Sequence, residues 1–172
     1  MVQTVVNTKL AIGVVGEFYD NSPRRVHGYI LAANGSVLPA ISKAFTKSAE
    51  GIATVGGNGL FLGLAVNPKE QALHGGLTPS LVLKDGAQGS LCDMGHIVVK
   101  CTTAVTEGQA CFYNTTDGTL AAAATGSVVA GHIEIKGSKF VFFNAAANEP
   151  AVVELLGFTT GSAAEESGSG SI

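Results

Sequence analysis

The side chains best suited to bind a metal ion are three cysteines and one histidine near the middle of the chain. Cys92, His96, Cys101 and Cys111 fall within twenty residues, and thiolate and imidazole are preferred ligands of Zn²⁺. No two of the cysteines have the close spacing of a zinc ribbon. If a strand runs from His96 to Cys101, these two side chains point to opposite faces. We therefore expect no metal site, and we interpret the cysteines as small buried side chains.

Other motifs for catalysis or cofactor binding are incomplete. Gly56-Gly-Asn-Gly59 is not followed by Gly-Lys-Ser/Thr, and a dinucleotide fingerprint begun at Gly57 would place Leu62 at its third glycine. The four histidines never occur as His-x-His, and no Gly-x-Ser-x-Gly is present. The adjacent acids Glu165 and Glu166 lie in a Gly/Ser-rich stretch. We expect no enzyme activity and no cofactor, and we interpret the glycine-rich stretch as a turn before a strand.

The segment Glu17-Phe-Tyr-Asp-Asn-Ser-Pro-Arg-Arg25 instead has the side chains of a binding surface. Arginine offers fork-shaped donors suited to carboxylates on a partner, and tyrosine often anchors interfaces. Tyr19, Arg24 and Arg25 are therefore the candidate interface residues. A solvated turn with internal salt bridges explains the same residues equally well, and the sequence leaves the choice open.

Composition narrows the class of protein. The chain has 172 residues, ten Lys and Arg, and a formal net charge of −3, so it lacks the basic stripe of a nucleic-acid binder. It contains neither a signal peptide nor the roughly 18 apolar residues that span a bilayer. Three cysteines without a secretion signal indicate reduced thiols and synthesis in a cytosol. Charged residues make up only 13%, which favours a surface partly covered by a partner.

Alternating apolar residues predict β-strands, and Asp-Gly turns separate them. Asn67, Pro68 and Glu70 form a helix-start pattern that predicts a short helix over residues 67–74. Residues 39–47 fit either a helix or an edge strand. The strands are expected in the following ranges: 10–18, 60–66, 81–83, 132–136, 140–143 and 151–156.

These elements predict an all-β, antiparallel fold. The preferred architecture is a jelly-roll-like two-sheet sandwich, and a β-barrel or tulip-like packing is the alternative. We expect one β domain over residues 1–156. Residues 157–172 are small, polar and Gly/Ser-rich, and are expected to form a flexible C-terminal tail.

Several segments, in the same order along the chain, resemble the structural cement proteins of tailed bacteriophages. The opening segment Ala11-Ile-Gly-Val-Val-Gly-Glu-Phe-Tyr-Asp-Asn-Ser-Pro-Arg-Arg-Val26 is similar to the start of that family. The resemblance covers about residues 5–156. Further matching segments are Leu64–Ala72, Leu77–Leu81, Leu83–Gly89, Met94-Gly95, Gly108–Tyr113 and Gly137–Asn144.

The resemblance implies a jelly-roll-like virion protein without catalytic residues. It implies binding to the outer capsid surface, bridging of neighbouring major capsid protein subunits, and self-association as a dimer or trimer. Such a protein is made and assembled in the cytoplasm of the bacterial host. Its partners are the major capsid protein and itself, with no nucleic acid, membrane or small-molecule substrate.

Three other functions remain open at this point. A phage head fibre or tail adaptor would differ from a cement protein in its copy number per virion. A small-molecule or metal-binding β-barrel needs convergent polar groups in a cavity. An enzyme, the third, needs several of the scattered His, Asp and Glu residues to meet in one cleft.

Overall fold

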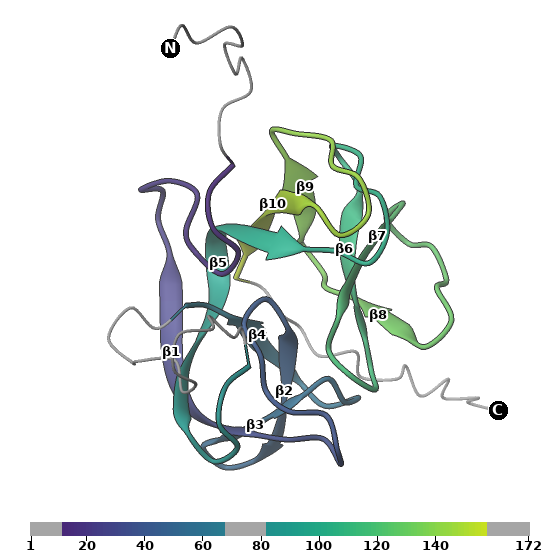
Figure 1. Cartoon of the computed structure of the whole chain (residues 1–172). Helices are drawn as coiled ribbons and strands as arrows, with labels where there is room; N and C mark the ends of the chain where they lie inside the picture. The colour runs from purple at the N-terminus through teal and green to yellow at the C-terminus, as the bar shows by residue number, and fades with distance from the viewer. Residues whose placement is uncertain (1–11, 68–81, 158–172) are drawn as a thin grey trace, which may run out of the picture.

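The computed structural model of the chain describes residues 12–67 and 82–157. Figure 1 shows strands joined by loops and turns, in two groups. The strands are β1 (Arg25–Ala32), β2 (Ala44–Ala49), β3 (Ile52–Val55), β4 (Phe61–Ala65), β5 (Gln88–Lys100), β6 (Ala110–Asn114), β7 (Leu120–Ala123), β8 (His132–Glu134), β9 (Lys139–Val141) and β10 (Pro150–Leu156).

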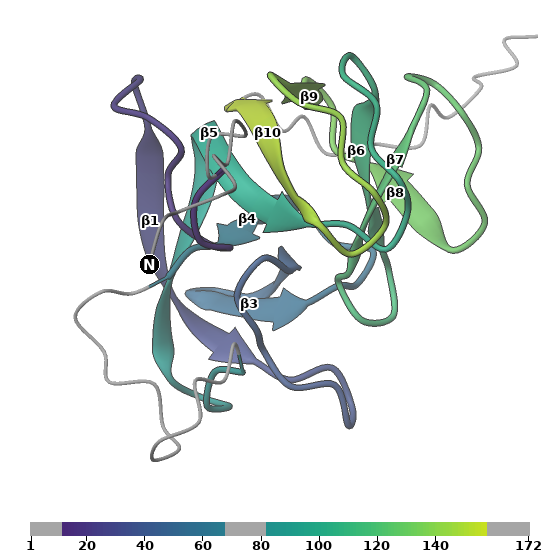
Figure 2. The ribbon, with the colours of Figure 1, turned by 45° about the horizontal axis from the view of Figure 1, so that its top comes forward.

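The larger sheet closes on itself. Its order is β1-β3-β2-β4-β5-β10-β9, and β1 also pairs with β5, so β1 to β5 form a closed ring. The β1–β3 pair is parallel, while the other strand pairs of this sheet are antiparallel. A second sheet has the order β7-β6-β8 and lies on the side of the molecule opposite β1 (Figures 1 and 2).

The two largest apolar cores hold these sheets together. The core inside the ring includes Leu31, Phe45 and Leu91, each with no exposed surface. The larger core joins the outer face of the ring to β10 and the second sheet, and includes Leu64 and Tyr113. Complete burial of one such side chain contributes about 1.5–3 kcal/mol to folding. Strands β4 and β5 contribute side chains to both cores and therefore connect them.

Glycine permits a close approach of the ring to the β6–β7 hairpin. Gly118, with φ of 69°, ends the turn of this hairpin, and a Cβ atom there would lie 2.6 Å from the carbonyl oxygen of Ala44. Gly56 faces the same turn, where a Cβ atom would lie 2.8 Å from the carbonyl oxygen of Thr115. Side chains at these two positions would force the two sheets apart.

Most expected strands are present. The hairpin at Asp117-Gly118 is confirmed, and β4, β8 and β10 confirm three of the expected ranges. Residues 39–47 contain the start of β2, so this region forms a strand and not a helix. The expected helix over 67–74 lies outside the described residues apart from Asn67, as does residue 81 of the expected 81–83 strand.

The strand expected over residues 10–18 is wrong for its described part. Residues 12–17 form a loop and a turn, and only Phe18 makes an isolated bridge, to Ile97. Gly13 and Gly16 have φ of 112° and 87°. These left-handed conformations interrupt a strand despite its alternating apolar residues.

The all-β class is confirmed. Of the two expected architectures, the closed ring corresponds to the barrel-like one, with the second sheet packed against its outer face. Among residues 12–67 and 82–157, no helix combines the length and apolar composition that crossing a bilayer requires.

Candidate functional site

Residues 16–19 are attached to β5 through their backbone. Gly16 N–H donates to the Val98 carbonyl at 2.8 Å, and Val98 N–H donates to the Glu17 carbonyl at 2.9 Å. Tyr19 N–H donates to the His96 carbonyl, also at 2.9 Å. This ladder fixes where the following side chains emerge at the surface.

Tyr19 belongs to a surface cluster of aromatic rings. Its ring stacks on Phe142, with centroids 5.0 Å apart, and meets the edge of Phe143 at 6.0 Å. The His96 ring approaches Phe142 edge-on at 5.2 Å. Phe142 remains 45% exposed, although its φ of 71° is unfavourable for a bulky residue. We call Tyr19, His96, Phe142 and Phe143 the aromatic cluster.

A carboxylate fixes the histidine of this cluster. Asp20 Oδ2 lies 2.7 Å from His96 Nδ1, and Ser22 Oγ donates to Asp20 Oδ1 at 2.5 Å. The hydrogen bond from Ser22 and then that from His96 lower the pKa of Asp20 from 3.8 to about 2. Since an ionised carboxylate only accepts, Nδ1 carries a proton. Glu154 Oε1 lies 3.6 Å from the other ring nitrogen.

Arg24 follows Tyr19 by five residues and is exposed. Its guanidinium carbon sits 4.6 Å from the centroid of the Phe18 ring, a distance at which a cation is attracted to the ring face. No ion pair involving Arg24 occurs among the described residues. Arg24 therefore packs on Phe18 and lies at the surface.

Arg25, although adjacent, is paired within the chain. Its Nε donates to Asp93 Oδ1 at 2.8 Å, and one terminal nitrogen donates to Asp93 Oδ2 at 2.5 Å and to the Gly157 carbonyl at 2.7 Å. Asp93 is 8% exposed. The hydrogen bond and the charge of this carboxylate raise the pKa of Arg25. The guanidinium thus joins β1 to β5 and to the end of β10.

The structure therefore gives the three predicted interface residues different surroundings. Tyr19 lies in the aromatic cluster, Arg24 is exposed, and Arg25 makes the kind of internal salt bridge that was the competing interpretation. Sequence reasoning missed Asp93 and Phe142. Asp93 follows a buried residue in an apolar strand, and that pattern can signal a buried carboxylate in need of a cation.

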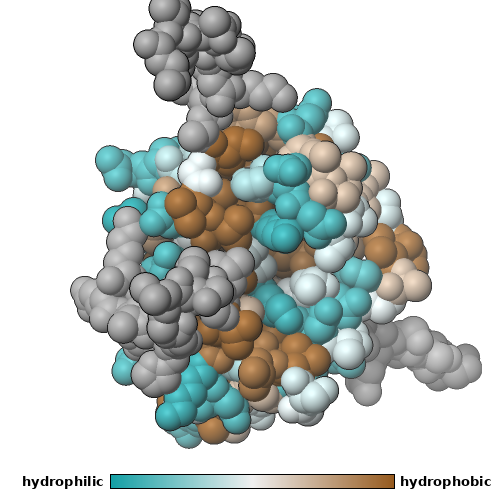
Figure 3. Space-filling view, in the orientation of Figure 1, coloured by the Kyte–Doolittle hydropathy of each residue, from teal (hydrophilic) through white to brown (hydrophobic). Residues whose placement is uncertain are grey.

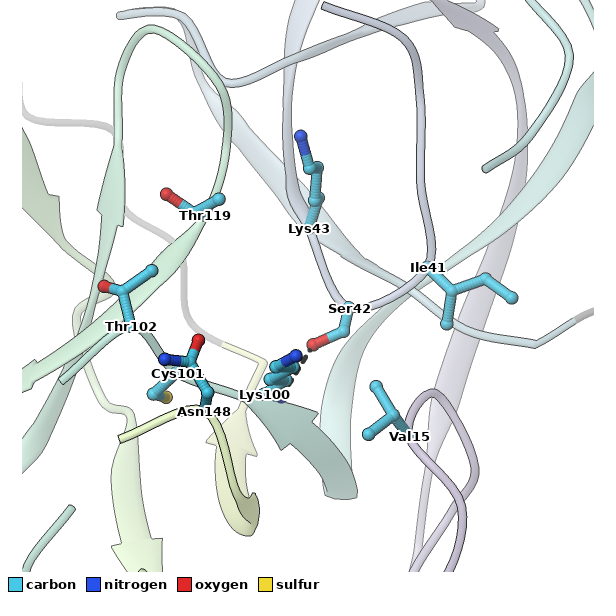
Figure 4. A pocket seen from close by; sticks show the side chains of 9 residues that line it. All are labelled: Val15, Ile41, Ser42, Lys43, Lys100, Cys101, Thr102, Thr119 and Asn148. Atoms are coloured by element: carbon cyan, nitrogen blue, oxygen red, sulfur yellow. Dashed lines mark hydrogen bonds between the residues drawn. The ribbon is translucent and has the colours of Figure 1, made fainter. Parts of the chain in front are cut away.

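A groove of about 260 Å³ lies where the ring meets the second sheet. Figure 4 shows Lys43 and Lys100 among the residues around it, and Ser42 Oγ accepts a hydrogen bond from Lys100 N–H at 2.9 Å. Ser42 and Asn148, both with φ near 65°, flank the groove. Its cations suit an acidic side chain, and its remaining surface is largely apolar.

Exposed apolar surface is dispersed over the face drawn in Figure 3, in patches divided by hydrophilic residues. Burial raises the pKa of Cys92 to about 11 and that of Cys101 to about 12. The buried Cys111 thiol has a pKa well above its usual value for the same reason. These thiols stay protonated at neutral pH and are poor nucleophiles and ligands. Among the described residues, no three His, Cys, Asp or Glu side chains are grouped so as to hold a metal ion.

Comparisons with known proteins give one matching family and several similar structures. The sequence model of one family, described as structural cement protein (E217 gp24/Pam3 gp6), matches residues 2–156. A chain in the capsid of Myoviridae phage XM1 is 14% identical, with a TM-score of 0.61, covering 91% of this chain and 98% of that one. The N base of head fiber gp8.5 in bacteriophage phi29 is 12% identical, with a TM-score of 0.45, covering 78% and 98%. No curated protein matches the sequence significantly.

Proposed function

The chain belongs to the structural cement protein family of phages, and we propose that it binds the outer surface of an assembled head and bridges neighbouring major capsid protein subunits. Family membership makes it a virion structural protein that stabilises the capsid. The proposal adds the surface to which it binds and the subunits that it joins.

The observation that carries the proposal is the display of Tyr19 and Arg24 on a fixed backbone. The hydrogen-bond ladder to β5 holds residues 16–19, and stacking on Phe142 limits the rotation of the Tyr19 ring. A surface ordered in advance loses little conformational entropy on binding. Tyr19 can therefore serve as an apolar anchor, with Arg24 as the partner of a capsid carboxylate.

Arg25 belongs to the same predicted interface but contributes differently. Its donors are already bound to Asp93 and Gly157. We assign it the task of holding the end of β1 against β5, so that Arg24 is presented to the partner. Truncation of Arg25 should therefore reduce folding stability as well as binding.

The mechanism needs only binding energy. A head carries many copies of its capsid subunit, so each modest contact is repeated around the shell, and a bridging molecule gains avidity from two attachments. Catalysis, cofactors, metal ions, nucleic acid and membranes have no role in this proposal. Copies of the chain associate as a dimer or trimer. Synthesis and assembly take place in the cytoplasm of the bacterial host.

The proposal is tested by co-sedimentation with expanded phage heads that lack the protein. We expect saturable binding, with a copy number proportional to the number of capsid subunits. Arg24→Ala should weaken binding by about tenfold if it removes one charge-assisted contact worth about 1.4 kcal/mol. Lys47→Ala is the matched control, because it removes one positive charge from an exposed position on β2.

Three outcomes would count against this proposal. Equal loss of binding in the Arg24 and Lys47 variants would indicate a general charge effect and would remove Arg24 from the interface. A few copies per head, in place of a number that follows the capsid subunit, would favour a head fibre or tail adaptor. Absence of binding to correctly expanded heads would reject the cement function itself.

A further inference from the structure

Within residues 12–67 and 82–157, the outer edge of β1 is open over residues 25–29. One edge pairs with β5 from Arg25 to Ile30. The other pairs with β3 only from Ile30 to Ala32. Along residues 25–29, no strand of the described part of the chain covers this second edge. Figures 1 and 2 both place β1 at the side of the molecule away from the second sheet.

The hydrogen bonds of β1 show which backbone groups point outward. Leu31 N–H donates toward the β5 side, to the Ala87 carbonyl at 2.9 Å. Ile30 N–H donates to the opposite side, to the Gly51 carbonyl at 3.0 Å. Because successive backbone groups alternate in a strand, Gly28 and Val26 point to the same side as Ile30. The N–H and carbonyl groups of Val26 and Gly28 are therefore presented at the open edge.

The side chains along this edge are also exposed. Val26 is 40% and Ile30 is 48% exposed, and with Gly28 they lie on one face of the strand. Exposed apolar residues beside unpaired backbone groups are a template for adding another strand. Soluble proteins usually block such an edge with lysine, proline or a covering loop. The exposed residues 25–28 contain neither lysine nor proline.

We propose that the open edge of β1 pairs antiparallel with the same edge of a second copy of this chain. A two-fold axis passes through His27, so that Val26 of each copy lies opposite Gly28 of the other. Each opposed pair exchanges two N–H···O=C bonds, which uses all four outward groups of each edge. The inference specifies a surface for the self-association in the proposed function.

Three properties of the edge favour a second copy as its occupant. The open stretch is symmetric about His27, so a single register satisfies both chains. In this register Val26 of one copy lies opposite Gly28 of the other, where no side chain obstructs it. The exposed Val26 and Ile30 side chains of both copies then form one apolar strip. Arg25 faces Tyr29 of the second copy, so this register opposes no two arginines.

A cysteine on the two-fold axis tests this register. Residues opposite each other in a non-hydrogen-bonded antiparallel pair have Cα atoms about 4.5 Å apart, within the span that a disulfide bridges. In His27→Cys, diamide should accept two electrons and two protons from the paired thiols and give a covalent dimer. Wild type is the background control, because Cys92, Cys101 and Cys111 are buried.

Val26→Cys is the matched control. Two residues at position 26 lie diagonally across the axis, about 7–8 Å apart, beyond the usual reach of a disulfide. We expect His27→Cys to cross-link at least about tenfold faster than Val26→Cys, given the steep dependence of disulfide formation on this distance. Equal rates, or faster cross-linking at position 26, would overturn the register and with it the proposal.

Proline at position 28 tests the pairing without a cysteine. Gly28→Pro removes one outward N–H, and sedimentation equilibrium should show a shift from dimer to monomer. Gly28→Ala keeps the N–H and should keep the dimer, since the nearest atom to its Cβ would be Gln88 Nε2, at 3.2 Å. Val26→Lys, at an exposed site, provides a third variant should the proline variant fold poorly.

The outcomes separate this inference from the proposed function. A wild type that binds heads but is monomeric and does not cross-link would overturn the pairing and leave the cement function intact. Cross-linking at position 27 without head binding would support the pairing and reject the cement function. A monomer whose head binding is lost in Gly28→Pro would show that a capsid strand occupies the edge, and would also overturn the proposal.

Discussion

The ring of β1 to β5 and the segment of residues 16–25 are both attached to β5, but different interactions hold them. In the ring, Leu31, Phe45 and Leu91 are completely buried against one another. In the segment, backbone hydrogen bonds to Val98 and His96 and polar pairs provide the attachment, and its side chains remain partly exposed. The ring thus gains stability from burial that is unavailable to a binding surface.

The difference separates two tasks. Buried residues of the ring are replaceable only by others of similar size and polarity, because a packed interior tolerates few changes in volume. Apart from Arg25, which is bonded to Asp93, the exposed residues of the segment can be changed with little effect on folding, as long as the backbone ladder remains. Mutations should therefore fall into two classes, with losses of stability in the ring and losses of partner binding in the segment.

The largest expected effect is in the ring. Phe45→Ala should lower the free energy of unfolding by about 3–5 kcal/mol, because it removes a buried ring and leaves a cavity. Urea denaturation of both proteins measures the change. Val14→Ala is the control, since Val14 is 58% exposed and should change stability by less than about 0.5 kcal/mol. Similar losses in both variants would remove the distinction between ring and segment.

The next effect lies where the segment joins the ring. Asp93→Ala should cost about 1–2 kcal/mol, because it removes the hydrogen bonds that a nearly buried carboxylate makes to Arg25. The control is Glu107→Ala, which removes an exposed acid. If a double-mutant cycle between Asp93 and Arg25 shows no coupling, the ion pair does not hold β1 against β5.

Within the aromatic cluster, two variants of Phe142 separate the cost of its backbone conformation from the loss of its ring. Phe142→Gly and Phe142→Ala both remove the ring, but alanine keeps the cost of a φ of 71°. The glycine variant should therefore be more stable than the alanine variant by roughly 1 kcal/mol. Thermal denaturation of both gives the difference. A more stable alanine variant would mean that the left-handed conformation is not strained at this position.

The sequence predicted those parts of the fold that depend on local patterns. The alternation in residues 60–66 gave β4, and Asp117-Gly118 gave the β6–β7 hairpin, because side-chain period and turn chemistry act over a few residues. The alternation in residues 10–18 gave the wrong result. There, glycines in left-handed conformations form a turn, and the alternating pattern contains no information about their φ angles.

The candidate site was predictable only in part. Residue type alone singled out Tyr19 and Arg24 as interface candidates, and their role as anchors stays a prediction. The pairing of Arg25 with Asp93 and the stacking of Tyr19 on Phe142 join positions that are 68 and 123 residues apart in the sequence. Such contacts follow from the closure of the ring and the return of β9, and a single sequence has no short-range signal for either.

The smallest expected effect concerns Asp20, which holds His96 at the edge of the segment. Its pKa in the folded protein is about 2, below the ordinary 3.8. A lowered pKa stabilises the fold at pH values above about 4, and this contribution is lost as the pH falls toward 2. Wild type should therefore be slightly more stable than Asp20→Asn at pH 6, and the difference should shrink between pH 4 and pH 2, as measured by urea denaturation.

A difference that is constant over this range would mean that His96 and Ser22 bind the neutral side chain equally well. In that case the segment would be held by its backbone ladder alone, and its contrast with the ring would be sharper.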